Sequence, residues 1–267
     1  MRNDATCVNV LFEHISMTRI HLYRHISLLA GIMLLFATLQ AVADDQPTVS
    51  PTLTVVSAPS SDDSSTSEGQ QQSYSGSAPA QLLFEANPAS TDGWTCNYEW
   101  HFFHESDTTA YLVRHEEETE YTFTESGTHR IQLWATFTRG DERVEYSEDY
   151  YNLEGGQQLT VSISESDLSF PNAFSPNGDG YNDTYHAKTG YKSIVEFHAT
   201  IFNRWGQKIY SWDDPAGGWD GTFNGKPVKE GVYYVLVKAR GADGRVFNIK
   251  RDVNLLRGYN ESTSTNE

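Results

Sequence analysis

Cysteine is nearly absent from the chain, whose 267 residues include only Cys7 and Cys96. Cleavage of an N-terminal leader would remove Cys7, so the mature chain is not expected to contain an intramolecular disulfide. No cysteine stands at the predicted cleavage site, which argues against a lipid anchor. Cys96 lies in WTCNYEW, a predicted strand. We interpret it as a small buried hydrophobic residue, with a reactive thiol as the alternative.

Basic residues are also scarce. The chain has 19 Lys and Arg against 36 Asp and Glu, a formal net charge of -17. Proteins that bind nucleic acid use Lys and Arg to displace the counterions of the phosphate backbone. The composition therefore predicts no nucleic-acid partner.

A hydrophobic run long enough to cross a membrane is missing. The apolar run at residues 26–39 is shorter than the roughly 20 residues of a membrane span, so we predict no transmembrane anchor. Arg19 and Arg24 precede this run, and Ala41-Val42-Ala43 follows it. This order is typical of a Sec signal peptide cleaved after Ala43. Residues 1–16 fit no such pattern, so we expect the true start at Met17 and an N-terminal extension before it.

Helical periodicity is lacking after the leader. Residues 44–78 are rich in Ser, Thr, Gln, Pro and Gly and predict a flexible linker, with a glycosylated stalk as the alternative. Only LTVV in this segment could form a strand. Residues 79–166 alternate with period two: Tyr98, Trp100 and Phe102 share one face of a predicted strand. The block therefore predicts an all-β sandwich, with strand candidates QLLFEA, TCNYEWHFF, TEYTFTE, THRIQLWATFT, RVEYSEDYY and LTVSIS.

Recognisable catalytic frames are absent. The sequence contains no G-x-S-x-G, no phosphate loop and no Cys/His nucleophile pair. His101 and His104 stand three apart in a predicted strand and would face opposite sides, which argues against a shared zinc ion. Carboxylates are numerous, but none lies in a recognisable catalytic frame. We therefore predict that the chain is not an enzyme.

Residues 167–258 form a second block with four separated motifs. They are FPNAFSPNGDGYNDTY, IFNRWGQKIYSW, GGWDGTFNGKPVKEGVYYVLVKA and a closing VNLLR. In GVYYVLVKA both alternating faces carry apolar residues, which predicts a central strand. The turn GADG between two apolar runs predicts a hairpin.

In their order and position, these motifs resemble the gliding motility-associated C-terminal domain, the type B sorting domain of the Bacteroidota type IX secretion system. The tail GYNESTSTNE at residues 258–267 is a departure, because the family usually stops soon after the Leu-Leu-Arg-like strand. The resemblance implies that a Sec signal takes the chain to the periplasm and that the type IX translocon then exports it. It also implies a secreted or cell-surface location.

The preceding block resembles a PKD-type immunoglobulin-like domain in the elements NPAS, YEWHF and EYTFTESGTHRIQLWATF. Together the two resemblances imply an all-β chain of two immunoglobulin-like β-sandwich domains after a signal peptide and a linker. PKD domains usually act as spacers or as protein- or sugar-contact modules.

The residues that match the sorting-domain motifs are the candidate site. They are Pro176, Asn177, Gly178, Asp179, Gly180, Asn182, Asp183, Asn203, Arg204, Trp205, Gly206, Trp219, Asp220 and Gly221. The glycines permit positive φ in tight turns. The two tryptophans leave two interpretations open: turn and core features of a small sandwich, or exposed parts of a surface that the translocon reads.

The acidic loop of residues 175–183 raises the question of calcium, which takes six to eight oxygen ligands. Compared with the helix-loop-helix calcium motif, Ser175 replaces the first Asp and His186 replaces the bidentate Glu. A looser calcium site at Asn177, Asp179, Asp183 and the Tyr181 carbonyl is one interpretation. The alternative is an Asx turn, in which these side chains bond their own backbone.

We therefore expect an exported surface protein whose central block is a non-enzymatic adhesion module. Its partners beyond the translocon would be a surface protein or a polysaccharide. The alternatives are a surface hydrolase with an unfamiliar site and a structural subunit of a surface or gliding apparatus.

Overall fold

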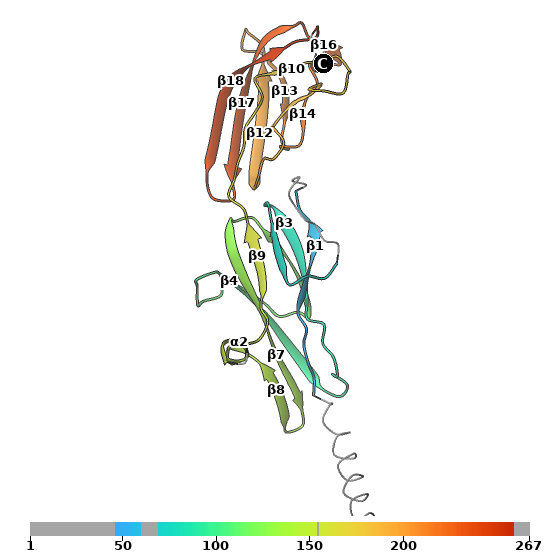
Figure 1. Cartoon of the computed structure of the whole chain (residues 1–267), viewed down its shortest axis with the longest axis vertical. Helices are drawn as coiled ribbons and strands as arrows, with labels where there is room; N and C mark the ends of the chain where they lie inside the picture. Colours follow the sequence, from blue (N-terminus) through green and yellow to red (C-terminus); the bar gives the residue numbers. More distant parts are fainter. Residues whose placement is uncertain (1–45, 60–68, 154, 259–267) are drawn as a thin grey trace, which may run out of the picture.

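The computed structural model describes residues 46–59, 69–153 and 155–258, which fold into two β-sandwiches arranged end to end (Figure 1). The predicted all-β class of two immunoglobulin-like sandwiches is confirmed. The predicted extension and signal peptide at residues 1–43, with Cys7, lie outside the described residues, as does the tail from residue 259. In the part of the chain that is described, no helix is long and apolar enough to cross a membrane.

The first sandwich packs a three-stranded sheet against a six-stranded sheet. The smaller sheet has the order β1 (Thr52–Ser57), β3 (Ala80–Glu85) and β6 (Glu118–Phe123). The larger one has the order β2 (Ser73–Gly76), β9 (Leu159–Ile163), β7 (Gly127–Arg139), β4 (Thr95–His104) and β5 (Leu112–Arg114), and β8 (Glu142–Tyr146) also pairs with β7.

Alternation along these strands builds the core, as the sequence predicts. Trp100 and Phe102 of β4, Leu133 of β7 and Phe84 of β3 have no exposed surface. The indole N–H of Trp100 donates to the carbonyl of Glu116 at 3.1 Å, so the largest buried side chain leaves no polar atom unpaired.

The prediction of a flexible linker over residues 44–78 is wrong for two of its segments, although LTVV, the one stretch in it expected to be able to form a strand, does so in β1. Strand β1 pairs antiparallel with β3, and its Leu53 is fully buried in the first core. Strand β2 pairs in parallel with β9, and Tyr74 is 7% exposed. Both segments are ordered by long-range pairing with strands of the first sandwich rather than by their own composition.

The predicted strand RVEYSEDYY is correct only up to Tyr146. Residues beyond it form the short helix α2 (Glu148–Leu153). Its first turn contains acidic side chains, which interact favourably with the positive end of the helix dipole. The hydroxyl of Tyr151 donates to the Leu133 carbonyl at 2.6 Å and accepts from the Leu133 N–H at 3.0 Å. Strand β9 pairs with β7 up to Ile131 and β8 from Ala135 on, so Tyr151 satisfies the backbone between them.

The second sandwich is built on a five-stranded sheet with the order β10 (Ala173–Phe174), β18 (Val246–Leu255), β17 (Gly231–Gly241), β12 (Ile194–Phe202) and β13 (Lys208–Trp212). Two short pairs complete it: β11 (Tyr185–His186) with β14 (Gly218–Trp219), and β15 (Thr222–Phe223) with β16 (Lys226–Pro227). The predicted central strand is β17, and residues 241–245 form the predicted hairpin turn between β17 and β18.

Hydrogen bonds join the two sandwiches around Ser193, whose side chain is 1% exposed. The Ser193 hydroxyl accepts from the Ala78 N–H at 3.1 Å and lies 2.9 Å from the Ser164 hydroxyl. The Asp243 carboxylate accepts from the Ser166 N–H at 3.1 Å and from its hydroxyl at 2.7 Å. Strand β9 therefore passes into the second sandwich through a bonded joint.

Candidate functional site

The sorting-motif turns lie at the distal end of the second sandwich, by which we mean the end remote from the first sandwich (Figure 1). Strand β12 runs from the joint to this end, where Asn203 follows it, and β17 returns from Gly231 towards the joint. The motifs are separate in sequence, but the sheet brings their turns to one place.

The loop of residues 175–183 is held by its own side chains. Asp183 accepts from the N–H groups of Asn177 at 3.0 Å, Gly178 at 2.7 Å and Gly180 at 2.9 Å. These backbone donors, Gly178 and Gly180 foremost, hold the pKa of the Asp183 carboxyl below its ordinary value. Gly178 and Gly180 have φ of 80° and 87°, which favours glycine at both positions.

Asn177 and Asp179 complete this network. Asn177 Oδ1 accepts from the Asp179 N–H at 3.0 Å, and Asp179 Oδ1 accepts from the Tyr181 N–H at 2.9 Å. These are the hydrogen bonds of the Asx-turn alternative. Among residues 46–59, 69–153 and 155–258, no group of three or more His, Cys, Asp or Glu is placed to hold a metal ion. Calcium binding by this loop stays a prediction.

The NRWG motif is the turn between β12 and β13. Asn203 Oδ1 accepts from the N–H groups of Trp205 and Gln207, each at 3.0 Å, and Gly206 has a φ of 79°. Arg204 lies over the Trp205 ring with its guanidinium carbon 4.2 Å from the ring centroid. Asn203 and Gly206 therefore shape the turn, and the turn presents Arg204 and Trp205.

The WDG motif is a second side-chain-capped turn. Asp220 Oδ1 accepts from the N–H of Thr222 at 2.9 Å and from its hydroxyl at 2.8 Å. Gly221 has a φ of 76°, and a Cβ there would lie 2.9 Å from Pro176 Cγ and 3.1 Å from a methyl group of Leu255. The glycine is therefore needed both for the backbone conformation and for close packing of three segments.

The two motif tryptophans have different environments. Trp219 has no exposed surface, packs in the second core beside Phe174 and Tyr233, and donates its indole N–H to the Thr222 carbonyl at 2.8 Å. Trp205 is 75% exposed. The core interpretation therefore describes Trp219, whereas Trp205 is available to a partner.

Arg257, at the end of VNLLR, is a residue that the motif reasoning did not select. Its guanidinium donates to the carbonyls of Gly221 at 2.8 Å, Pro176 at 3.1 Å and Val228 at 3.3 Å. One side chain thus connects the acidic loop, the WDG turn and the segment before β17. The charge at the end of an apolar terminal strand was the signal available in the sequence.

An apolar patch extends from Trp205 over the outer face of β17. Trp205 and Val232 line one depression of about 430 Å³, and Val232, Tyr234 and Leu236 line a second of about 560 Å³. Val232 and Tyr234 are 46% and 48% exposed. Arg204, Lys229, Lys250 and Arg251 contribute four basic groups to the two depressions, against the acidic Glu230 and Asp252.

The residues that the sequence analysis discussed in the first sandwich, Cys96, His101 and His104, contact apolar or aromatic side chains. Cys96 is half-buried and packs against the first core, in keeping with a small hydrophobic residue. His101 stacks on the Trp134 ring at 3.7 Å between centroids, whereas His104 stacks on Tyr111 at 4.6 Å.

Residues 168–249 match the family model described as CHU_C Type IX secretion signal domain. The second sandwich is therefore a type IX secretion signal domain, and the resemblance seen in its motifs is confirmed. This domain implies that the type IX secretion system handles the chain and exports it to the cell surface or the medium. The PKD subfamily of the first sandwich stays a prediction.

No curated protein matches the chain. Solved structures with some likeness include dimeric latent PorU from Porphyromonas gingivalis, with 11% identity, 80% of this chain and 20% of that chain covered, and a TM-score of 0.24. A second is SGBP-B of the Bacteroides ovatus mixed-linkage glucan utilization locus, in complex with a mixed-linkage heptasaccharide, with 15% identity, 79% and 48% coverage, and a TM-score of 0.22.

A third likeness is to the tetra-tandem repeat in the extending region of a large adhesion protein, with 12% identity, 78% and 50% coverage, and a TM-score of 0.26. The chain thus spans between 20% and 50% of these three chains.

Proposed function

We propose that this chain is a surface protein exported first by Sec and then by the type IX system, with a non-enzymatic binding module as its cargo. The observation that carries the proposal is the secretion signal domain at residues 168–249. The cargo is the first sandwich, followed directly by the signal domain.

The translocon reads the distal end of the second sandwich through Trp205 and the neighbouring patch with Val232 and Tyr234. Exposed Trp, Tyr and Arg side chains around apolar depressions are typical of sites that carry most of an interface's binding energy. The basic rim of the patch favours an acidic partner surface. The remaining motif residues act by keeping the turns in shape.

The surroundings of two carboxylates in the first sandwich, Glu99 and Glu145, support a cargo that is not an enzyme. The depression on its larger sheet contains Glu99 and Glu145. Glu145 is paired with Arg143 at 2.9 Å and Glu99 lies 3.2 Å from His101, on an open sheet face. A glycosidase acid needs instead an apolar, desolvated site that keeps it protonated. This arrangement favours binding over the hydrolase alternative.

Deletion of residues 167–267 tests the export route. We expect the truncated chain to accumulate in the periplasm, because it lacks the signal domain. The measurement is immunoblotting of periplasm, surface and medium. Normal appearance of the truncated chain outside the cell would contradict the sorting role.

Two tryptophan variants separate recognition from folding. Trp205→Ala should reduce export at least tenfold while changing the free energy of unfolding by less than about 0.5 kcal/mol, because the side chain is largely exposed. Val246→Ala is the matched control, because Val246 is 64% exposed at the end near the joint. If Trp205→Ala is exported like this control, the distal patch is not the recognition surface.

A further inference from the structure

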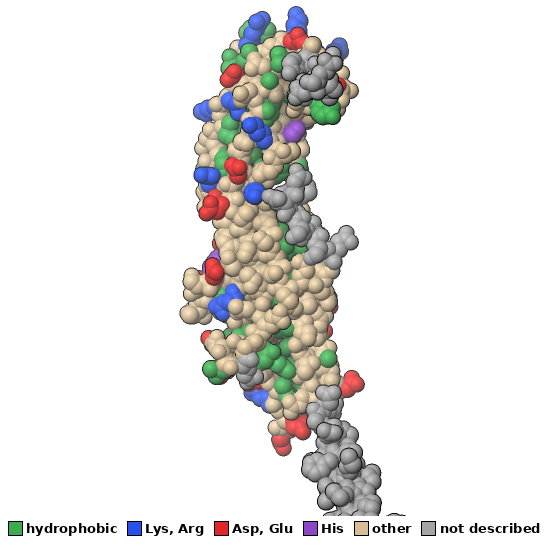
Figure 2. All heavy atoms as spheres, in the orientation of Figure 1, with side chains coloured by type: hydrophobic (Ala, Val, Ile, Leu, Met, Phe, Trp, Pro, Cys, Tyr) green, Lys and Arg blue, Asp and Glu red, His purple; other side chains and the backbone are tan. Residues whose placement is uncertain are grey.

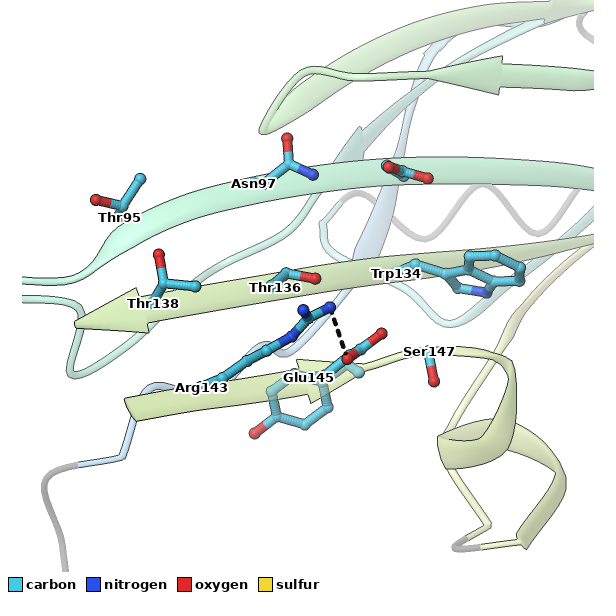
Figure 3. Close-up of a pocket in the computed structure, with 10 residues that line it drawn as sticks. Thr95, Asn97, Trp134, Thr136, Thr138, Arg143, Glu145 and Ser147 are labelled. Carbon is cyan, nitrogen blue, oxygen red and sulfur yellow. Dashed lines mark ion pairs between the residues drawn. The ribbon is translucent and has the colours of Figure 1, made fainter. Parts of the chain in front are cut away.

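The larger sheet of the first sandwich has a depression of about 400 Å³ on its outer face (Figure 3). Side chains of β4, β7 and β8 line it, and Ser147, which directly precedes α2, lies at one end (Figure 3). Most of the lining side chains point outward from these strands, whereas Tyr146 also packs against the first core.

Three cross-strand rows form the floor of the depression. Strands β4 and β7 pair Thr95 with Thr138, Asn97 with Thr136, and Glu99 with Trp134. Rows two residues apart along a strand are about 6.7 Å apart, so the first and third rows are separated by about 13 Å. A ligand that contacts all three rows is therefore elongated.

Much of the hydrogen-bonding capacity of this floor is unused. Within the described chain, no hydrogen bond involves the side chains of Thr95, Asn97, Thr136 or Thr138, although they line the depression. Hydroxyl and amide groups both donate and accept hydrogen bonds. They suit a ligand whose own groups also do both, as sugar hydroxyls do.

Trp134 supplies a fixed apolar wall. Its ring stacks on His101, with 3.7 Å between centroids and an interplanar angle of 23°. Its indole N–H donates to Gln132 Oε1 at 3.2 Å, and Gln132 Nε2 donates to Gln158 Oε1 at 3.2 Å. An aromatic ring held in place by its neighbours can pack against an apolar ligand face without losing much side-chain entropy.

The charges around the depression favour a neutral ligand. Glu145 forms an ion pair with Arg143. Glu99 is hydrogen-bonded to His101, whose pKa burial lowers, so Glu99 keeps its negative charge and opposes an anion. The guanidinium of Arg143 lies over the floor (Figure 3) and opposes a cation. Residues 46–167 contain 21 Asp and Glu, four Arg and no Lys, whereas residues 168–258 contain 9 acidic and 12 basic residues. The basic side chains visible in Figure 2 accordingly lie mostly over the second sandwich. The first sandwich would repel a polyanion.

We propose that this depression binds a chain of a neutral polysaccharide. Trp134 stacks against the apolar face of a sugar ring, and Asn97 and the threonines hydrogen-bond its hydroxyls. This inference rests on the proposed function in that it takes the first sandwich as a binding module, but it can be tested without export.

The experiment uses purified full-length protein in affinity gels that contain laminarin, hydroxyethyl cellulose or dextran as neutral probes. Alginate is the polyanion probe and glycol chitosan the polycation probe. We expect retardation by at least one neutral polymer, weakened at least tenfold by Trp134→Ala and about threefold to tenfold by Asn97→Ala. Trp205→Ala is the matched control, because it removes an exposed tryptophan from the other sandwich and should bind as the wild type does.

Asn97 is exposed, so Asn97→Ala tests the site even if Trp134→Ala disturbs folding. Thermal unfolding of each variant identifies such a disturbance. The proposal is overturned if no neutral polymer retards the protein, if only the charged polymers do, or if folded Trp134→Ala and Asn97→Ala proteins bind unchanged. None of these results would contradict the export proposal. Conversely, export that is unchanged by the deletion or by Trp205→Ala would not contradict the proposal that the first sandwich binds a polysaccharide.

Discussion

Replacing Arg257 by alanine should destabilise the second sandwich more than the same replacement of any other exposed or half-buried basic residue in that sandwich. The guanidinium binds the carbonyls of Pro176, Gly221 and Val228. In addition, the backbone N–H groups of Arg257 and Gly258 both donate to Glu230, the latter at 2.9 Å. The variant would keep the backbone bonds and lose the three side-chain bonds.

The magnitude follows from these three bonds. A hydrogen bond from a charged donor contributes about 1.5–3 kcal/mol, but Arg257 is half-buried and water can reach the freed carbonyls. The two shorter bonds at about 1 kcal/mol each, with a smaller share from the 3.3 Å bond, give a loss of about 2–3 kcal/mol. For a domain of this size, that loss lowers Tm by roughly 10–20 °C.

Calorimetry of the full-length protein is the assay. Arg240→Ala is the matched control, because the Arg240 ion pair with Glu196 is exposed and such pairs contribute about 0–1 kcal/mol. Arg257→Lys should recover less than half of the loss, since an ammonium group cannot reproduce the guanidinium geometry. A loss for Arg257→Ala below about 0.5 kcal/mol would refute the view that this side chain holds the distal end together.

Four further outcomes are expected. Trp219→Ala should cost about 3–5 kcal/mol, measured by chemical denaturation, because Trp219 is fully buried. Asp243→Ala should speed cleavage between the sandwiches by a non-specific protease, because Ser166 loses its acceptor; an unchanged rate would contradict the bonded joint. Burial lowers the pKa of His129, so protonation favours the unfolded chain, and stability should fall as the pH drops below about 6.5; a melting temperature that is flat from pH 7 to 5 would contradict this. If calcium occupies the acidic loop, it should raise the melting temperature and Asp179→Ala with Asp183→Ala should abolish the rise; if the Asx turn is the whole role of these side chains, calcium should have no effect.

The sequence predicted the strands whose alternation is local. In β4 and β7, period two places Trp100, Phe102 and Leu133 inward, and nothing elsewhere in the chain is needed to infer it. Strand β2 could not be found this way. Its residues SYSG include one large apolar side chain, Tyr74, and its partner β9 begins at Leu159, so only the folded sheet reveals the pairing.

The end of β8 shows a local signal that period-two reasoning overlooked. The acidic pair Glu148 and Asp149 at the start of a short segment is typical of a helix N-terminus. The reason for a helix there is tertiary, because it positions the Tyr151 hydroxyl on the backbone of β7 at Leu133. The spacing of residues in the sequence does not indicate either of these two hydrogen bonds.

The candidate site was found by its motifs, but the roles of its members required the structure. Trp205 directly precedes Gly206, and Trp219 directly precedes the pair Asp220-Gly221, so both stand in glycine-containing turn motifs that do not separate a core role from a surface role. Trp219 lies in the core because its strand β14 pairs with β11, opposite Tyr185, inside the sandwich. Trp205 is exposed to solvent because it lies in the hairpin turn that follows β12. Arg257 was missed because its partners are three backbone carbonyls, which no side-chain pattern encodes.

The positions of the joint and the distal end bear on how the signal domain works. The chain enters the second sandwich through Ser164 and Ser166, which are bonded to Ser193 and Asp243. The motif turns lie at the opposite end of the same sheet, so a partner that binds the Trp205 patch need not displace the first sandwich. A protease would have to open these joint bonds to separate the two sandwiches. We therefore expect the folded first sandwich to be carried with the signal domain as one unit while the translocon holds the distal end.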